Sequence, residues 1–250
     1  MTPPSEPLRD DGGSDREGEA ESGSASVGDD GAERASAAAL IPPLGAPVPA
    51  PAPRKRPKPG ERRVQILQTL ATMLEEPGAE RVTTAALAAK LGVSEAALYR
   101  HFASKAQMFE GLIEFIEQSV FALVNQVAER EADAVQQARR MLAVVLQFGE
   151  KNPGMTRVMV GDALVFEHER LTARMNQFFD RIESQLRQCL RVAAEQAGSQ
   201  TPTVDAAGQA SALVAFAVGR LQRFARSRFR KSPTEHLDIA LALFAGGAPR

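Results

Sequence analysis

Three helix-start signals stand close together in one short stretch, and they restrict what this part of the chain can fold into. Thr83, Ser94 and Ser104 each precede a helix-forming run. Each hydroxyl can accept a backbone N–H group that the first turn of a helix leaves unpaired. Gly92 lies between the first two, where one short helix has to end and the chain has to turn sharply. This spacing predicts two short helices joined by a tight turn, followed by a third helix.

The neighbouring sequence completes this pattern as a helix-turn-helix unit. Apolar residues at helical spacing predict a helix over 61–75, before the two short helices at about 84–91 and 95–101. A longer helix is predicted to start at Lys105. Two short helices joined by a glycine-containing turn, after a preceding helix, are typical of the helix-turn-helix motifs that bind DNA.

The two faces of the second short helix differ in chemistry. The residues expected to point inward around the turn are Leu87, Leu91, Val93, Leu98 and Phe102. Those expected to point outward are Glu95, Ala96, Tyr99 and Arg100. The only tyrosine of the chain therefore lies beside an arginine on the outward face, although aromatic residues make up only 5% of the sequence.

This outward face suits double-stranded DNA. One helix fits the major groove, with its N-terminal residues facing the base edges. Arg100 can pair with a guanine edge, which contributes about 1–3 kcal/mol of discrimination, while Tyr99, His101 and Lys105 suit phosphates. The predicted DNA-binding residues are Thr83, Thr84, Ser94, Glu95, Ala96, Ala97, Tyr99, Arg100, His101 and Lys105.

Three of these residues also allow other interpretations. Tyr99 can be a half-buried core residue whose hydroxyl reaches water, and His101 can stabilise the C-terminus of its helix. Glu95 can accept a hydrogen bond from a cytosine amine, or it can interact with the N-terminal dipole of the helix.

The rest of the chain continues as helices and predicts an all-α fold. The segment "ARRMLAVVLQFGEKNPG" is a helix that ends at its Pro-Gly pair, and "ERLTARMNQFFDRIESQLRQCLRVAAEQ" is a long amphipathic one. Strand signals are absent from the sequence. We therefore expect a helix-turn-helix domain over 60–107 and a helical domain over 108–250.

Residues 1–59 differ from the rest and are predicted to be a disordered acidic and Pro-rich extension. Residues 1–53 carry ten acidic and three basic side chains, a net charge of −7. Because the whole chain has a net charge of −1, residues 54–250 carry +6. The extension ends in a basic arm that is predicted to touch DNA phosphates. Its basic side chains, together with the first two of the next predicted helix, are Arg54, Lys55, Arg56, Lys58, Arg62 and Arg63.

Composition and spacing do not favour an enzyme or a membrane protein. The three histidines, His101, His168 and His236, are far apart, and none stands at metal-ligand spacing. Cys189 lies on an apolar helix stripe, and one cysteine in this chain fits a reducing cytoplasm. No apolar run is long enough to cross a bilayer, and the acidic N-terminal stretch lacks the basic-then-apolar order typical of a signal peptide. We expect no catalytic residue, cofactor, metal or membrane anchor.

The segment 61–109, with "GVSEAALYRHFASKAQMF", resembles the DNA-binding domain of TetR-family regulators. The resemblance implies an N-terminal DNA-binding domain and a helical C-terminal domain that dimerises through its last long helices. A dimer places its two recognition helices about one DNA turn apart, roughly 34–36 Å, on a palindromic site.

A narrower resemblance, carried by "IEFIE" and "FGEKNPGMTR", is to the nucleoid occlusion factors of this family. It implies a cytoplasmic, nucleoid-associated protein that binds the division protein FtsZ while bound to DNA and blocks septum assembly. The matching partner-binding positions are Phe115, Lys151 and Asn152. The long N-terminal extension departs from this branch, as does Leu123, where the branch typically has a basic residue.

Other functions stay open at this point. A ligand-responsive TetR-type repressor shares the same DNA-binding domain, and a small molecule would then enter the C-terminal domain. A DNA-compacting protein would also share it, with little sequence preference. Phe115 can be an ordinary core residue beside Leu112 and Ile116, and Lys151 and Asn152 can be ordinary helix-end residues before Pro153.

Overall fold

The computed structural model describes residues 60–76 and 81–245, with no side-chain detail for 244–245. The predicted extension over 1–59 lies outside the described residues. Every element in the described ranges is helical, which confirms the all-α prediction. The helices are α2 (Glu61–Glu75), α3 (Thr84–Leu91), α4 (Glu95–Tyr99), α5 (Lys105–Arg130), α6 (Ala134–Lys151), α7 (Pro153–Met159), the 3₁₀ helix η2 (Asp162–Leu164), α8 (Glu169–Gln196), α9 (Pro202–Arg226) and α10 (Leu237–Ala245).

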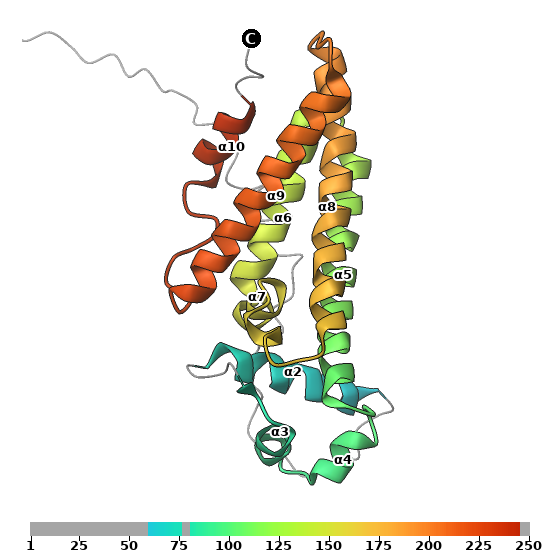
Figure 1. Ribbon diagram of the computed structural model, residues 1–250, viewed down its shortest axis with the longest axis vertical. Coiled ribbons are helices and arrows are strands. Elements are labelled where there is room, and N and C mark those ends of the chain that lie inside the picture. Colours follow the sequence, from blue (N-terminus) through green and yellow to red (C-terminus); the bar gives the residue numbers. More distant parts are fainter. Residues whose placement is uncertain (1–59, 77–80, 246–250) are drawn as a thin grey trace, which may run out of the picture.

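The helices form a small head below a long body (Figure 1). The helices α5, α6, α8 and α9 run along the body, and α2, α3 and α4 lie across its lower end. Their apolar faces meet in one core that extends from Leu70 and Leu98 in the head to Phe148 and Leu186 in the body. Because α5 begins in the head and continues into the body, the predicted boundary at 107/108 falls in its first turns.

One predicted helix is shorter than expected, and two later helices end near residues with positive φ. The recognition helix α4 ends at Tyr99, and the next two residues form a turn. The segment "MTRVMVGDALVF" is divided into α7 and η2, because Gly161 adopts a positive φ of 84°. Helix α9 ends at Arg226, and Arg228 and Phe229 then adopt positive φ values of 55° and 62°.

The head is fixed to the body where α2 meets the first turn of α7. Gly154 packs directly on the Ala71 carbonyl, so closely that a Cβ at this position would overlap that oxygen. Burial raises the pKa of the Glu75 carboxyl beside it, and a hydrogen bond from the Gly154 backbone lowers that pKa by less. The ionised form of Glu75 is therefore disfavoured by folding.

We expect Glu75→Gln to increase the free energy of unfolding at neutral pH. The glutamine keeps an oxygen for the Gly154 backbone but has no charge to desolvate. Because the folded-state pKa is raised, the wild type loses stability as the pH rises from the ordinary value of 4.5 through the folded pKa. The variant and the wild type should be equally stable below that window in urea titrations. A variant that is weaker at every pH would contradict this account.

Candidate nucleic-acid interface and partner surface

The recognition helix α4 presents the face that the sequence predicts. Its N-terminus is capped by Ser94, whose hydroxyl accepts from the Ala97 backbone N–H at 3.3 Å. Leu98 is 1% exposed and anchors the helix in the core. Tyr99 is 46% exposed, so it lies on the outer surface rather than in the core. Arg100 and its neighbour His101 are exposed as well.

The turn before α4 has the geometry that only a glycine adopts easily. Gly92 has a φ of 63° and ends α3 in the left-handed conformation, as its place in the sequence indicates. At the other end of α3, the Thr83 hydroxyl accepts from the Ala86 backbone N–H at 3.2 Å. The hydroxyl hydrogen of Thr83 is not used in that bond, so it can donate to a phosphate.

Thr84 and Glu95 interact with each other in the structure. The Thr84 hydroxyl donates to Oε2 of Glu95 at 2.7 Å, which ties the first turn of α3 to the first turn of α4. This bond holds the Glu95 carboxylate at the N-terminus of the recognition helix, where the helix dipole favours it. Sequence spacing gives no signal for the pair, because the two residues are eleven positions apart on different helices.

Lys105, which the sequence predicts as a phosphate ligand, has a protein partner in the structure. Its ammonium forms an ion pair with Glu167, from the connector between α7 and α8. The Glu167 side chain is only 9% exposed, so the pair is well shielded from solvent. Lys105 therefore joins the head to the body in this structure, and a phosphate would have to compete with Glu167 for it.

The same connector touches the head at a second point. The Arg81 guanidinium lies 5.9 Å from the centre of the Phe166 ring. Phe166 is 66% exposed and Val165 beside it is 70% exposed. The connector thus approaches α3 and α5 together, a contact that no local sequence pattern predicts.

The predicted partner residues lie where α5 passes α6. Phe115 is partly buried against the core, with its ring centre 6.5 Å from that of Phe148. Lys151 follows Phe148 by three residues on α6, so the two share one helix face. Asn152 is only 3% exposed, and its side-chain amide donates to the Phe148 carbonyl at 2.9 Å. Its side chain lies behind the surface, in the junction between α6 and α7.

Comparisons with known proteins connect both halves of the chain to one family. Residues 66–112 match the model of the bacterial regulatory proteins of the tetR family, and residues 132–246 match an SlmA-like model of the tetracyclin repressor-like C-terminal domain. The nucleoid occlusion factor SlmA of Photobacterium profundum is 52% identical over 182 residues, which cover 72% of this chain and 92% of that protein. The chain belongs to the TetR family, among the SlmA nucleoid occlusion factors.

Other SlmA proteins give the same result. The one from Aliivibrio fischeri (strain MJ11) is 50% identical over 190 residues, 76% of this chain and 96% of that protein. Among solved structures, the TetR family regulator PfmR from Thermus thermophilus has a TM-score of 0.60 and 25% identity, over 74% of this chain and 100% of its own. FadR from Bacillus subtilis, solved with stearoyl-CoA, has a TM-score of 0.59 at 14% identity, over 74% of this chain and 98% of its own, and it supports the fold alone.

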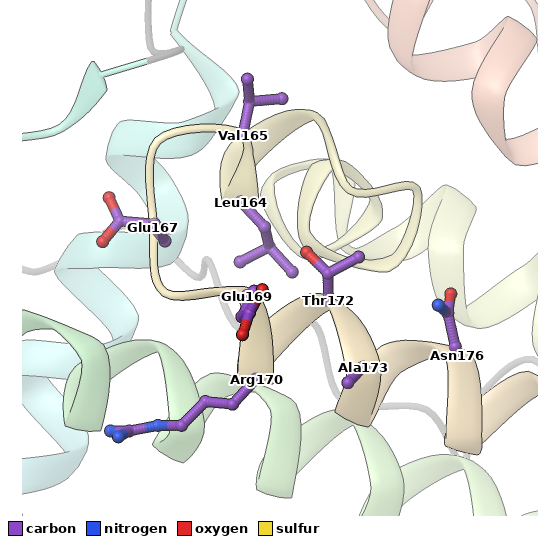
Figure 2. Close-up of a pocket in the computed structure, with 8 residues that line it drawn as sticks. All are labelled: Leu164, Val165, Glu167, Glu169, Arg170, Thr172, Ala173 and Asn176. Carbon is purple, nitrogen blue, oxygen red and sulfur yellow. The ribbon is translucent and has the colours of Figure 1, made fainter.

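One open pocket lies at the start of α8 in this SlmA-like chain (Figure 2). It is lined by Leu164, Val165, Glu167, Glu169, Arg170, Thr172, Ala173 and Asn176. Glu167 already pairs with Lys105, and Arg170 Nε donates to Glu110 at 2.8 Å. Two of its charged side chains are therefore engaged with α5 rather than free to bind a ligand in the pocket.

None of the groups of His, Cys, Asp and Glu within 60–76 and 81–245 could hold a metal ion. No helix in this part of the chain is long and apolar enough to cross a membrane.

Burial raises the pKa of the Cys189 thiol, whose sulfur lies 2.7 Å from Oε1 of Gln137.

Proposed function

We propose that this protein is a cytoplasmic, nucleoid-associated nucleoid occlusion factor. As a homodimer it binds palindromic DNA sequence-specifically, and in the DNA-bound state it engages FtsZ and blocks septum assembly over the nucleoid. The observation that carries this proposal is that about half of the aligned residues are identical to those of SlmA proteins, over nearly the whole length of those proteins. That similarity extends through both the DNA-binding head and the body.

The geometry of the head supports the DNA-binding part of this proposal. Tyr99 at the end of α4 and the C-cap residue Arg100 are both exposed, and the hydroxyls of Thr83 and Ser94 cap the N-termini of α3 and α4. Phosphate contacts set the register, and Arg100 reads a base edge. Several phosphate contacts in each subunit make the affinity fall steeply as the salt concentration rises.

The α5–α6 surface supports the partner-binding part. Phe115 supplies apolar area beside the Phe148 ring, and Lys151 supplies a cation at the end of α6. Phe115 and Lys151 belong to α5 and α6, which run along the body, and not to α3 or α4 (Figure 1). We therefore expect DNA bound to the head to leave them accessible. Asn152 acts from beneath this surface by fixing the end of α6. Leu123, further along α5, is partly buried and adds apolar area rather than charge.

The test is sedimentation of FtsZ polymers with the purified full-length protein, with and without a duplex selected from a random pool. We expect the protein to change the amount of pelleted FtsZ, and to change it more when the selected duplex is present. If FtsZ is unaffected in both cases while the duplex still binds, the protein acts as a TetR-type repressor. The search would then turn to a ligand of the body domain.

Reversing one charge on the partner surface should separate the two activities. We expect Lys151→Glu to reduce the effect on FtsZ at least about tenfold, while the affinity for the duplex stays within about twofold. Arg130→Glu is the matched control, because Arg130 also lies in the last turn of its helix and loses the same dipole interaction. Equal effects of both variants on FtsZ would contradict the assignment of Lys151.

A further inference from the structure

The recognition helix is too short to fix its own orientation. It has five residues, Glu95–Tyr99, and an isolated helix of that length is unstable in water. Leu98 anchors it in the core, and its angle in the major groove depends in addition on what holds its two ends. At the N-terminal end, the hydrogen bond from Thr84 to Glu95 supplies a connection to α3.

The C-terminal end is held by Arg63 on α2, which stands 38 positions before His101 in the chain. Its Nη1 donates to the carbonyl oxygen of His101 at 3.0 Å, in the turn that follows α4. The same guanidinium lies 4.2 Å from the centre of the Phe102 ring. Phe102 is 1% exposed and fixed in the core, so Arg63 connects the end of the recognition helix to a rigid point.

The two contacts of Arg63 need the shape of a guanidinium. A planar group can lie over an aromatic ring and also donate a hydrogen bond from its edge, whereas a lysine ammonium offers one compact charge. Arg63 therefore restrains both the orientation of the turn at His101 and its distance from α2. The other residue of this turn is Arg100, directly before His101, and the proposed function places Arg100 against a base.

We propose that Arg63 is a positioning residue for sequence recognition, which sets the orientation of α4 and of Arg100 in the groove. This inference rests on the proposed DNA-binding function. It differs from the sequence-based expectation that Arg63 belongs to a basic arm touching phosphates. A phosphate ligand contributes equally on every sequence, whereas a positioning residue contributes only where base contacts form.

The experiment compares full-length variants on the selected duplex and on a scrambled duplex over a series of salt concentrations. We expect Arg63→Lys to weaken binding to the selected duplex about tenfold or more, because both subunits carry the change, and to leave binding to the scrambled duplex nearly unchanged. The slope of affinity against salt should stay the same, since the charge is retained. Arg63→Ala should lower the ratio of the two affinities at least as far.

Arg62→Ala is the matched control. Arg62 is the neighbouring arginine on α2, and among the described residues its Nη1 donates to Gln65 on the same helix, at 2.8 Å. Its loss should lower both affinities alike and leave their ratio intact. If the wild type discriminates between the two duplexes and Arg63→Lys leaves the ratio of affinities unchanged, this inference is overturned while the proposed function stands. A wild type that does not discriminate would overturn the proposed function and this inference with it.

Discussion

Gly154→Ala will destabilise the protein by about 2–3 kcal/mol, although alanine is usually the better residue in a helix. Gly154 lies in the first turn of α7, where a glycine normally costs about 0.5–1 kcal/mol relative to alanine. Here the sign reverses, because the added Cβ would overlap the carbonyl oxygen of Ala71 in the backbone of α2. The overlap can be relieved only by moving α2 or α7, since no flexible side chain is available to move aside.

Gly111→Ala is the control for this variant. A Cβ at Gly111 would lie 3.1 Å from the two terminal methyl groups of Leu67, which can rotate or shift by a few tenths of an ångström. We expect a much smaller change in the free energy of unfolding, measured by urea titration of both variants. Equal stability of the two variants would contradict the proposed rigidity of the α2–α7 junction.

The α2–α7 junction also bears on how the two proposed activities, DNA binding and FtsZ binding, are coupled. The chain passes from Lys151 in the proposed partner surface through Pro153 directly into the contact with α2. If the α2–α7 contact holds the head in place, Gly154→Ala will reduce the extra change in pelleted FtsZ that the duplex causes. This reduction will be larger than the loss of affinity for the duplex.

The sequence predicted the elements whose causes are local. The start of α3 follows from Thr83 and that of α4 from Ser94, since each hydroxyl caps a backbone N–H three residues ahead. The end of α3 follows from Gly92, because few other residues adopt its positive φ easily. These signals are contained within a few positions, so no knowledge of the tertiary structure is needed to use them.

The contacts that sequence reasoning missed join residues far apart in the chain. Lys105 was expected to contact phosphate, but its partner Glu167 lies 62 positions later and gives no signal near Lys105. Arg63 was expected to be part of a basic arm, and its partner at His101 lies on another helix. Asn152 was expected at a surface, but the tight passage from α6 to α7 buries it. Each outcome depends on how helices pack, which local spacing does not determine.

Arg100→Ala will cause the largest loss of DNA binding. Arg100 is exposed at the end of α4, with its backbone in the right-handed helical region. A bidentate contact to guanine contributes about 1–3 kcal/mol in each half-site, so the homodimer should lose roughly thirty- to twenty-thousand-fold in affinity for the selected duplex. Fluorescence anisotropy on the selected and scrambled duplexes measures both the loss and its specificity.

The scrambled duplex decides which kind of contact Arg100 makes. A base contact predicts that affinity falls only for the selected duplex, whereas equal losses on both duplexes, with a smaller salt slope, would identify Arg100 as a phosphate ligand. The double variant Arg63→Ala Arg100→Ala then tests whether the two residues act together. If Arg63 acts by placing Arg100, the double variant will lose less affinity than the two single losses added together, because removing Arg100 leaves Arg63 with less to position.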